Sequence, residues 1–241
     1  MYLAKIRKSK YYQLVYFVDG KRTTISFART KYGAALYFKT LKAAFSKAVQ
    51  WEYLTENPFK KIKLPKVSKT FPVFISDIEL KAILKKTKEP PLKDLFTIAF
   101  YTGMRLGEIV NMQWSWIDLT DSKIPVKCSD SFSTKSRKER IIPVNQNLKN
   151  ILSNRLPKIL NINETNYVFS KHESVKLNED YVSKKFKEAV IAAGPDERIH
   201  FHNLRHSFAS ALVQKGVSLY VVKELLGHEA LLTTQTCPPF Y

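Results

Sequence analysis

A lysine-rich segment at residues 59–70 constrains the organisation of this chain most strongly. The segment FKKIKLPKVSKT contains five lysines and one proline but no acidic residue. Such a run favours a solvated linker, because its charges repel one another and its proline cannot donate a backbone hydrogen bond. Residues 1–70 carry 16 Lys and Arg against three acidic residues, whereas the remainder carries 24 against 18. We therefore expect a small, strongly basic N-terminal part joined to a larger part of nearly balanced charge.

Composition is typical of a globular protein from a reducing compartment. Of the 241 residues, 44% are hydrophobic, which is enough for a sizeable core. No apolar run reaches the roughly 18–20 residues of a membrane helix, and the first residues lack the apolar stretch of a secretory signal. Cys128 and Cys237 give no disulfide framework and no metal-ligand spacing. We expect a cytoplasmic protein with no membrane partner and no bound metal.

The basic charge favours nucleic acid as the partner. A formal net charge of +19, concentrated before residue 70, is typical of proteins that bind phosphate backbones. A highly solvated, soluble surface is the plain alternative. Membrane-surface binding fits less well, because the basic residues are not confined to one face of an amphipathic helix.

Local patterns predict a mostly helical chain with a small antiparallel β-sheet, an α+β arrangement. In residues 10–27, two strands flank Asp19-Gly20, a pair suited to a tight hairpin turn. The capping-box pattern of Ser76 and Glu79 opens a helix. Strand-like runs in 113–144 end in RIIPV. Helices are expected at about 33–54, 76–86, 92–101, from 105, and at 146–155, 179–193, 202–214 and 218–226.

The first candidate cluster is the sequence TGMRLGE at 102–108. Gly103 permits a tight turn before a helix, which puts Arg105 beside the helix N-terminus. A cation there is unfavourable for the helix itself, so the position indicates a bound anion. A surface pair between Arg105 and Glu108, three residues apart, is an equally weighted alternative.

Two further clusters follow towards the C-terminal end. His202 and Arg205 are three residues apart in HNLRHSFA, so a helix places both side chains on one face. A guanidinium can bind a phosphate with paired hydrogen bonds, and an imidazole can move a proton near neutral pH. In ELLGH, Gly227 is typical of a helix C-cap, which places His228 in a loop. Taken alone, each cluster is common in proteins without a catalytic site.

Together and in this order, the clusters resemble the tyrosine recombinase family, the site-specific recombinases of the phage-integrase type. The matching motifs are T-G-x-R-x-x-E, H-x-x-R, and L-G-H followed by T-T-Q. The resemblance implies that Arg105 and Arg205 hold the scissile phosphate. It implies further that His202 is a general base and that His228 donates another hydrogen bond to the phosphate.

The segment TKSRKERIIP at 134–143 resembles the β-hairpin of that family, which implies that Lys135 protonates the departing 5′ oxygen. Physical chemistry independently supports such a set, because Arg and His donors stabilise charge that develops on phosphate oxygens, and a lysine among cations can act as an acid. A covalent protein–DNA intermediate needs neither metal nor nucleotide. The chain also has no glycine loop of the Walker type, so we expect no cofactor.

The sequence departs from the family at the nucleophile. The family places a tyrosine nine residues after the L-G-H histidine, where this chain has Cys237. A cysteine side chain is shorter than that of tyrosine, and Pro238-Pro239 restrains the backbone that would have to compensate. Tyr241 is a weaker candidate, because chain ends are seldom ordered enough for chemistry. We therefore expect little or no cleavage, and the sequence leaves open whether the chain is an enzyme.

The resemblance also implies a shortened chain. Residues 1–30 resemble an arm-type, DNA-binding β-hairpin, residues 31–69 retain the last part of a helical core-binding domain plus the linker, and residues 70–241 form a C-terminally truncated catalytic domain. Candidate DNA-binding side chains are Lys21, Arg22, Lys60, Lys61, Lys63 and Lys66. A competent chain is expected to act as a homo-tetramer on DNA, and an incompetent one to remain a monomer.

The leading hypothesis is site-specific recombination or integration at an inverted-repeat site in double-stranded DNA, by strand breakage and rejoining through a covalent 3′-phosphoprotein intermediate. The alternative is a non-catalytic remnant of an integrase that occupies such sites. A helix-turn-helix regulator would also be basic and helical. That third hypothesis gives no reason for the joint presence of Arg105, Lys135, His202, Arg205 and His228.

Overall fold

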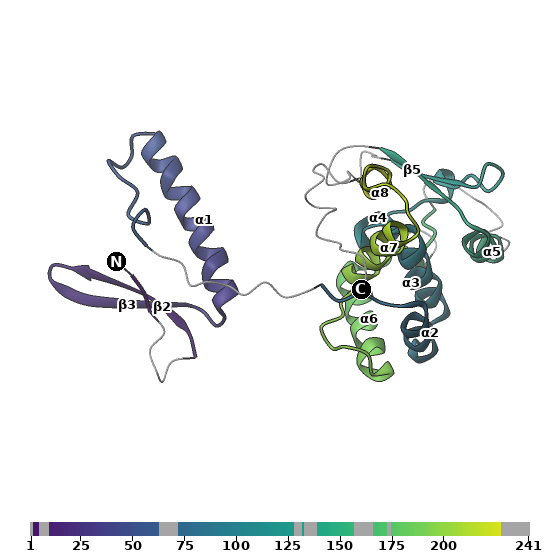
Figure 1. Cartoon of the computed structure of the whole chain (residues 1–241), viewed down its shortest axis with the longest axis horizontal. Helices are drawn as coiled ribbons and strands as arrows, with labels where there is room; N and C mark the ends of the chain where they lie inside the picture. Colours follow the sequence, from purple (N-terminus) through teal and green to yellow (C-terminus); the bar gives the residue numbers. More distant parts are fainter. Residues whose placement is uncertain are drawn as a thin grey trace. The chain divides into compact units, whose positions relative to one another are not determined.

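The computed structural model describes residues 2–4, 10–62, 72–127, 132, 139–156, 166–172 and 175–227. The chain divides into two compact units, Met1–Phe71 and Pro72–Tyr241, and each has its own hydrophobic core (Figure 1). Among the described residues, no helix combines the length and the apolar character needed to cross a membrane.

The N-terminal unit contains a three-stranded antiparallel sheet. Strands β1 (Tyr2–Ala4), β2 (Tyr12–Val18) and β3 (Lys21–Ala28) pair in the order β1-β2-β3. Asp19 and Gly20 link β2 to β3 with φ angles of 48° and 74°. Positive φ at both positions matches the twist of the flanking strands, so the turn forms where the sequence predicts it.

One long helix packs against this sheet. Helix α1 (Lys31–Gln50) contacts β3 and begins at the N-cap Thr30, whose hydroxyl accepts a backbone N–H of the first turn. The sequence pattern predicts a helix reaching about residue 54, but the helix ends earlier because Glu52 adopts a left-handed φ of 61°. Phe38 of α1 packs edge-on against Phe59, with ring centroids 5.7 Å apart, in a small core.

The described residues of the C-terminal unit form a set of helices with two short antiparallel strand pairs. The helices are α2 (Asp77–Lys86), α3 (Pro90–Thr102), α4 (Leu106–Val110), α5 (Gln146–Arg155), α6 (Glu179–Ala193), α7 (His202–Gln214) and α8 (Leu219–Leu226), with a 3-10 turn, η1 (Trp114–Trp116). The strand pairs are β4 (Lys123–Val126) with β5 (Arg140–Pro143), and β6 (Ser170–His172) with β7 (Val175–Lys176). The predicted α+β class is confirmed, and η1, β6 and β7 are additions to it.

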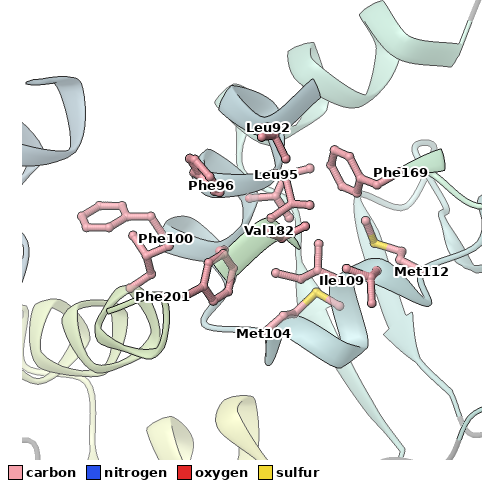
Figure 2. Packing of buried hydrophobic residues seen from close by; sticks show 14 of the residues in the cluster. Leu92, Leu95, Phe96, Phe100, Met104, Ile109, Met112, Phe169, Val182 and Phe201 are labelled. Carbon is pink, nitrogen blue, oxygen red and sulfur yellow. The ribbon is translucent and has the colours of Figure 1, made fainter. Parts of the chain in front are cut away.

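Helix α3 lies at the centre of this unit and contacts α2, α4, α5 and α7. Figure 2 shows apolar side chains from several elements meeting around it. Phe96 of α3 packs against Phe186 of α6 and against Phe201, with ring centroids 5.0 and 6.1 Å apart. Offset and edge-on aromatic pairs of this kind are favourable. The core therefore gives the helix ends a rigid support.

Helix α3 ends at a glycine that leaves no room for a side chain. Gly103 has a φ of 62°, and a Cβ atom there would lie 2.4 Å from Cδ1 of Phe208 and 2.8 Å from Cδ2 of Leu226. Helices α7 and α8 can therefore approach the end of α3 closely. This approach brings the turn that carries Arg105 next to both helices.

Replacing Gly103 with alanine should destabilise the C-terminal unit. We expect a loss of about 2–5 kcal/mol in the free energy of unfolding, from a positive φ costing about 1–2 kcal/mol and overpacking costing about 1–3 kcal/mol. Gly194→Ala is the matched control, because Gly194 ends α6 with a φ of 84° and has no atom within 4 Å of the added Cβ. Urea unfolding measures both variants. Equal losses would contradict the packing argument.

Candidate active site

Three arginines converge on the C-terminal end of helix α8, which lies against β5 and α7 (Figure 1). The backbone carbonyls of residues 225–227 each accept an N–H from a different arginine: Leu225 from Arg140 (2.8 Å), Leu226 from Arg205 (2.6 Å) and Gly227 from Arg105 (3.2 Å). The last carbonyls of a helix lack partners within it and carry the negative end of its dipole. Because the arginines come from different elements, this cluster requires the folded unit.

Arg105 is the N-cap residue of α4 and is held by Glu108. Its backbone N–H donates to Oε2 of Glu108 (2.8 Å), and its Nη1 donates to Oε1 (3.0 Å). The pair that the sequence left open therefore exists, but it is not a surface pair, because the side chain of Glu108 is only 1% exposed. The side chain of Arg105 is 23% exposed, so the described residues cover it only in part.

Arg205 lies on α7 and is buried, with 3% of its surface exposed. Its Nη1 donates to the carbonyl of Gly103 (2.7 Å), and its Nη2 donates to that of Leu226. These carbonyls satisfy a cation that would otherwise be unfavourable inside the protein. Arg105 bonds the very next carbonyl, that of Gly227, so the two arginines predicted to hold one phosphate are anchored on neighbouring residues.

Arg140 completes the cluster and was not singled out from the sequence. It begins β5, and its Nη1 and Nη2 donate to Oε1 and Oε2 of Glu108 (3.0 and 2.6 Å). Burial opposes ionisation of Glu108, but the bonds and charges of Arg140 and Arg105 outweigh it and hold the pKa of that carboxyl below its ordinary value. The sequence did contain a signal for Arg140, because it is a charged residue at the start of the apolar run RIIPV. A charged side chain in a buried strand needs a buried partner.

His202 opens helix α7 and is exposed. Its ring lies edge-on to that of His206, one turn later, with centroids 4.7 Å apart and planes at 88°. Burial, and secondarily the charge of Arg205, lower the pKa of His206, which favours a neutral imidazole there. Helix α7 therefore carries the exposed imidazole of His202 on the same face as the buried guanidinium of Arg205, three residues later.

Some of the residues expected at the site fall outside the described part of the chain: Lys135, His228, Cys237 and Tyr241, together with Lys63 and Lys66 of the linker. The remaining DNA-binding candidates are exposed side chains of the N-terminal unit: Lys21, Arg22, Lys60 and Lys61. Within the described residues, no group of three His, Cys, Asp or Glu side chains is arranged to hold a metal ion.

Comparison with known sequences identifies a family match over most of the C-terminal unit. The model of the phage integrase family matches residues 74–236. Tyrosine recombinase XerC of Pediococcus pentosaceus is 30% identical over 207 residues, covering 81% of this chain and 67% of the relative. Tyrosine recombinase XerD of Lacticaseibacillus casei is 29% identical over 191 residues, covering 76% and 63%. The chain thus spans about two thirds of the length of these relatives.

Solved structures share the fold. A lambda integrase dimer bound to a COC′ core site aligns with a TM-score of 0.69 at 24% identity, covering 86% of this chain and 59% of the integrase. The integrase of transposon Tn1549, in complex with transposon right-end DNA, aligns with a TM-score of 0.73 at 17% identity, covering 87% and 75%. At these identities, the likeness establishes the fold.

The low pKa of Glu108 makes the stability of this unit sensitive to acid. A carboxyl with a lower pKa in the folded state stabilises fully above its unfolded pKa, about 4.3 for Glu, and loses this contribution as the pH falls through the folded value. The free energy of unfolding should therefore decline below about pH 5, and Glu108→Gln should reduce that decline while lowering stability at neutral pH.

Urea unfolding at a series of pH values in high salt measures this decline. Salt screens exposed charge pairs more than the buried pair of Glu108. Asp196 is an exposed carboxyl whose pKa is lowered to about 2, mainly by hydrogen bonds from Arg198, so it can also contribute to a decline in acid. Asp196→Asn is the matched control, and it should reduce the decline less than Glu108→Gln does, because exposed pairs contribute little to stability. An identical decline in the parent chain and in Glu108→Gln would contradict the assignment.

Proposed function

This chain belongs to the phage integrase family, the tyrosine recombinases of site-specific DNA recombination, and we propose that its C-terminal unit holds the scissile phosphate of double-stranded DNA between Arg105 and Arg205. The observation that carries this proposal is the anchoring of both guanidinium groups on adjacent carbonyls at the end of α8. Donors that are fixed before the substrate arrives stabilise charge where it develops. The DNA complexes of the lambda and Tn1549 integrases support DNA as the partner.

The proposed reaction is a phosphoryl transfer to the protein. A nucleophilic side chain attacks phosphorus, the bond from phosphorus to the 5′ oxygen breaks, and a 3′-phosphoprotein bond forms. His202 takes the proton of the nucleophile, and Lys135 gives a proton to the departing 5′ oxygen. Arg105, Arg205 and His228 stabilise the non-bridging oxygens. Attack by a 5′ hydroxyl reverses these steps and rejoins the strand, so no metal or nucleotide is consumed.

The nucleophile limits this reaction in the present chain. Cys237 stands where the family has its tyrosine, and a cysteine side chain is shorter than the tyrosine side chain that it replaces. Pro238 and Pro239 restrict the backbone that would have to carry the thiol closer. The chain therefore binds its site but forms little covalent adduct, and Tyr241 is the secondary candidate for any adduct that does form.

The N-terminal unit supplies phosphate contacts in this proposal. Its exposed basic residues include Lys21 and Arg22 at the start of β3, and Lys60 and Lys61 at the start of the linker. Lysine and arginine side chains bind the DNA backbone without reading its sequence, and they release counterions as they do so. The release of counterions makes the affinity for DNA depend on the salt concentration.

A second function is favoured by Cys237: a DNA-binding protein that occupies inverted-repeat recombination sites in the cytoplasm without cutting them. Strand exchange between two sites requires four subunits, so a cleaving chain assembles as a homo-tetramer on DNA. A chain that only occupies a site can act as a monomer. The two functions therefore differ in covalent adduct formation and in assembly.

Substitution of the nucleophile separates these functions. Cys237→Tyr should produce a covalent protein–DNA adduct with a nicked suicide site, whereas the parent chain should produce little or none. The preorganised cluster would then surround a phosphate within reach of a phenol oxygen. Denaturing gel electrophoresis of the labelled DNA detects the adduct, and a gel shift of the same samples confirms binding.

Tyr241→Phe and the double variant Cys237→Tyr, Arg105→Gln are the controls for this experiment. An adduct in the parent chain that Tyr241→Phe abolishes would identify Tyr241 as the nucleophile and refute the role of position 237. An adduct that persists when Arg105 is replaced would refute the proposed phosphate site. Normal DNA binding without any adduct in Cys237→Tyr would favour the non-catalytic function.

The linker lysines should determine part of the salt dependence of DNA binding. Replacing Lys60, Lys61, Lys63 and Lys66 with glutamine should reduce the slope of log affinity against log salt by about 0.9 for each lysine that contacts a phosphate. The matched control replaces four exposed lysines of α2 and α6: Lys81, Lys85, Lys86 and Lys184. Fluorescence anisotropy with a labelled duplex measures both slopes. An unchanged slope in the linker variant would remove these lysines from the interface.

A further inference from the structure

Arg140 contacts the carboxylate and the helix end that hold Arg105. Its Nη1 and Nη2 pair with Glu108, which also accepts two hydrogen bonds from Arg105. Its Nε donates to the carbonyl of Leu225, two residues before the carbonyl of Gly227 that Arg105 binds. All three of its guanidinium nitrogens, Nε, Nη1 and Nη2, already donate to protein groups. Arg140 is therefore placed to act on Arg105 through other groups.

The contact of Arg140 with Gly227 is close. A Cβ atom on Gly227 would lie 3.2 Å from Nη1 and 3.3 Å from Cδ of Arg140, and Gly227 has a φ of 65°. The backbone at the end of α8 therefore rests directly against this guanidinium. Movement of Arg140 would shift the carbonyl that positions Arg105.

The charges around Glu108 give Arg140 a second effect. Glu108 is an ionised carboxylate with two guanidinium partners, those of Arg105 and Arg140. With Arg105 as its only partner, the carboxylate would balance the one positive charge and weaken attraction of a phosphate. With Arg140 present, two positive charges face one negative charge. The excess positive charge then remains on Arg105, the more exposed of the two arginines.

We propose that Arg140 is a positioning residue that neutralises Glu108 and so leaves the charge of Arg105 available to a phosphate oxygen. This inference rests on the phosphate site of the proposed function. A buried ion pair is by itself weak evidence for a stabilising interaction. The proposal therefore gives the pair of Arg140 and Glu108 a role other than stability.

Arg155 offers a matched comparison within the same unit. It donates from Nη1 to Asp94 (2.8 Å) and from Nη2 to the carbonyl of Val168 (3.1 Å), so it also combines a carboxylate with a backbone carbonyl. Neither Asp94 nor Val168 belongs to the cluster around Glu108. Arg155→Gln should therefore lower stability without changing the affinity of the site for an anion.

Inorganic phosphate is the probe for the test, and the full chain is used. Thermal unfolding of the C-terminal unit is followed by the fluorescence of its buried Trp114 and Trp116, across phosphate concentrations at constant ionic strength set by chloride. The rise of Tm with phosphate yields an apparent Kd, because a ligand that binds the folded state stabilises it. The variants are Arg140→Gln, Arg140→Lys, Arg140→Gln with Glu108→Gln, Arg155→Gln and Arg105→Gln.

Arg140→Gln should weaken phosphate binding about tenfold, equivalent to about 1.4 kcal/mol. Arg140→Lys keeps the positive charge but not the paired geometry, and it should remain within about threefold of the parent chain. The double variant removes the carboxylate that Arg140 neutralises, so it should recover most of the lost affinity. Arg155→Gln should bind phosphate as the parent chain does, despite a lower Tm.

Each contrary result points to a different error. If phosphate does not raise the Tm of the parent chain, or still raises it in Arg105→Gln, the phosphate site is refuted and with it the proposed function. Normal binding in Arg140→Gln would refute the positioning role alone. Packing rather than charge would be responsible if Arg140→Lys lost as much phosphate affinity as Arg140→Gln. The same would hold if the double variant recovered none of that affinity. Should Arg140→Gln fail to fold, Arg140→Lys and the double variant still decide between these outcomes.

Discussion

The burial of positive charge at the end of helix α8 is the constraint on which the rest of the site depends. Arg140 and Arg205 lie where water has little access, and a guanidinium without partners there is strongly unfavourable. The fold supplies carbonyl groups that a helix terminus leaves unbonded, at residues 225–227, together with the carboxylate of Glu108. Because the arginines come from β5, α7 and the turn before α4, these elements must take their positions around α8 together.

Two glycines provide carbonyls to the arginines of this site. Gly103 and Gly227 both have positive φ angles, and both provide a carbonyl to an arginine. A Cβ atom would clash at Gly103 and would fit only tightly at Gly227. Their neighbours are the packed side chains of Phe208 and Leu226 in one case and the guanidinium of Arg140 in the other. The aromatic packing of α3 against α6 holds the helix whose end Gly103 forms. The core and the site are thus connected through the ends of α3 and α8.

On the proposed function, this arrangement separates anion binding from bond cleavage. Binding a phosphate depends on Arg105 and Arg205, which the fold holds in place before any ligand arrives. Cleavage depends in addition on a nucleophile with sufficient reach, and Cys237 stands at that position in the sequence. A chain of this family can therefore keep its phosphate site while losing its reaction, because different parts of the chain supply the two.

The sequence by itself determined the local elements and the family. Asp19-Gly20 located the β2–β3 turn, and Ser76 with Glu79 located the start of α2, because these signals act through bonds within a few residues. The motifs singled out Arg105, His202 and Arg205 as residues of one site. Only the tertiary structure decided that Glu108 is buried and that Arg140 shares it. The partners of Arg140 lie 32 and 85 residues away, at Glu108 and Leu225. No local periodicity encodes contacts across such separations, since they arise only when whole elements pack against one another.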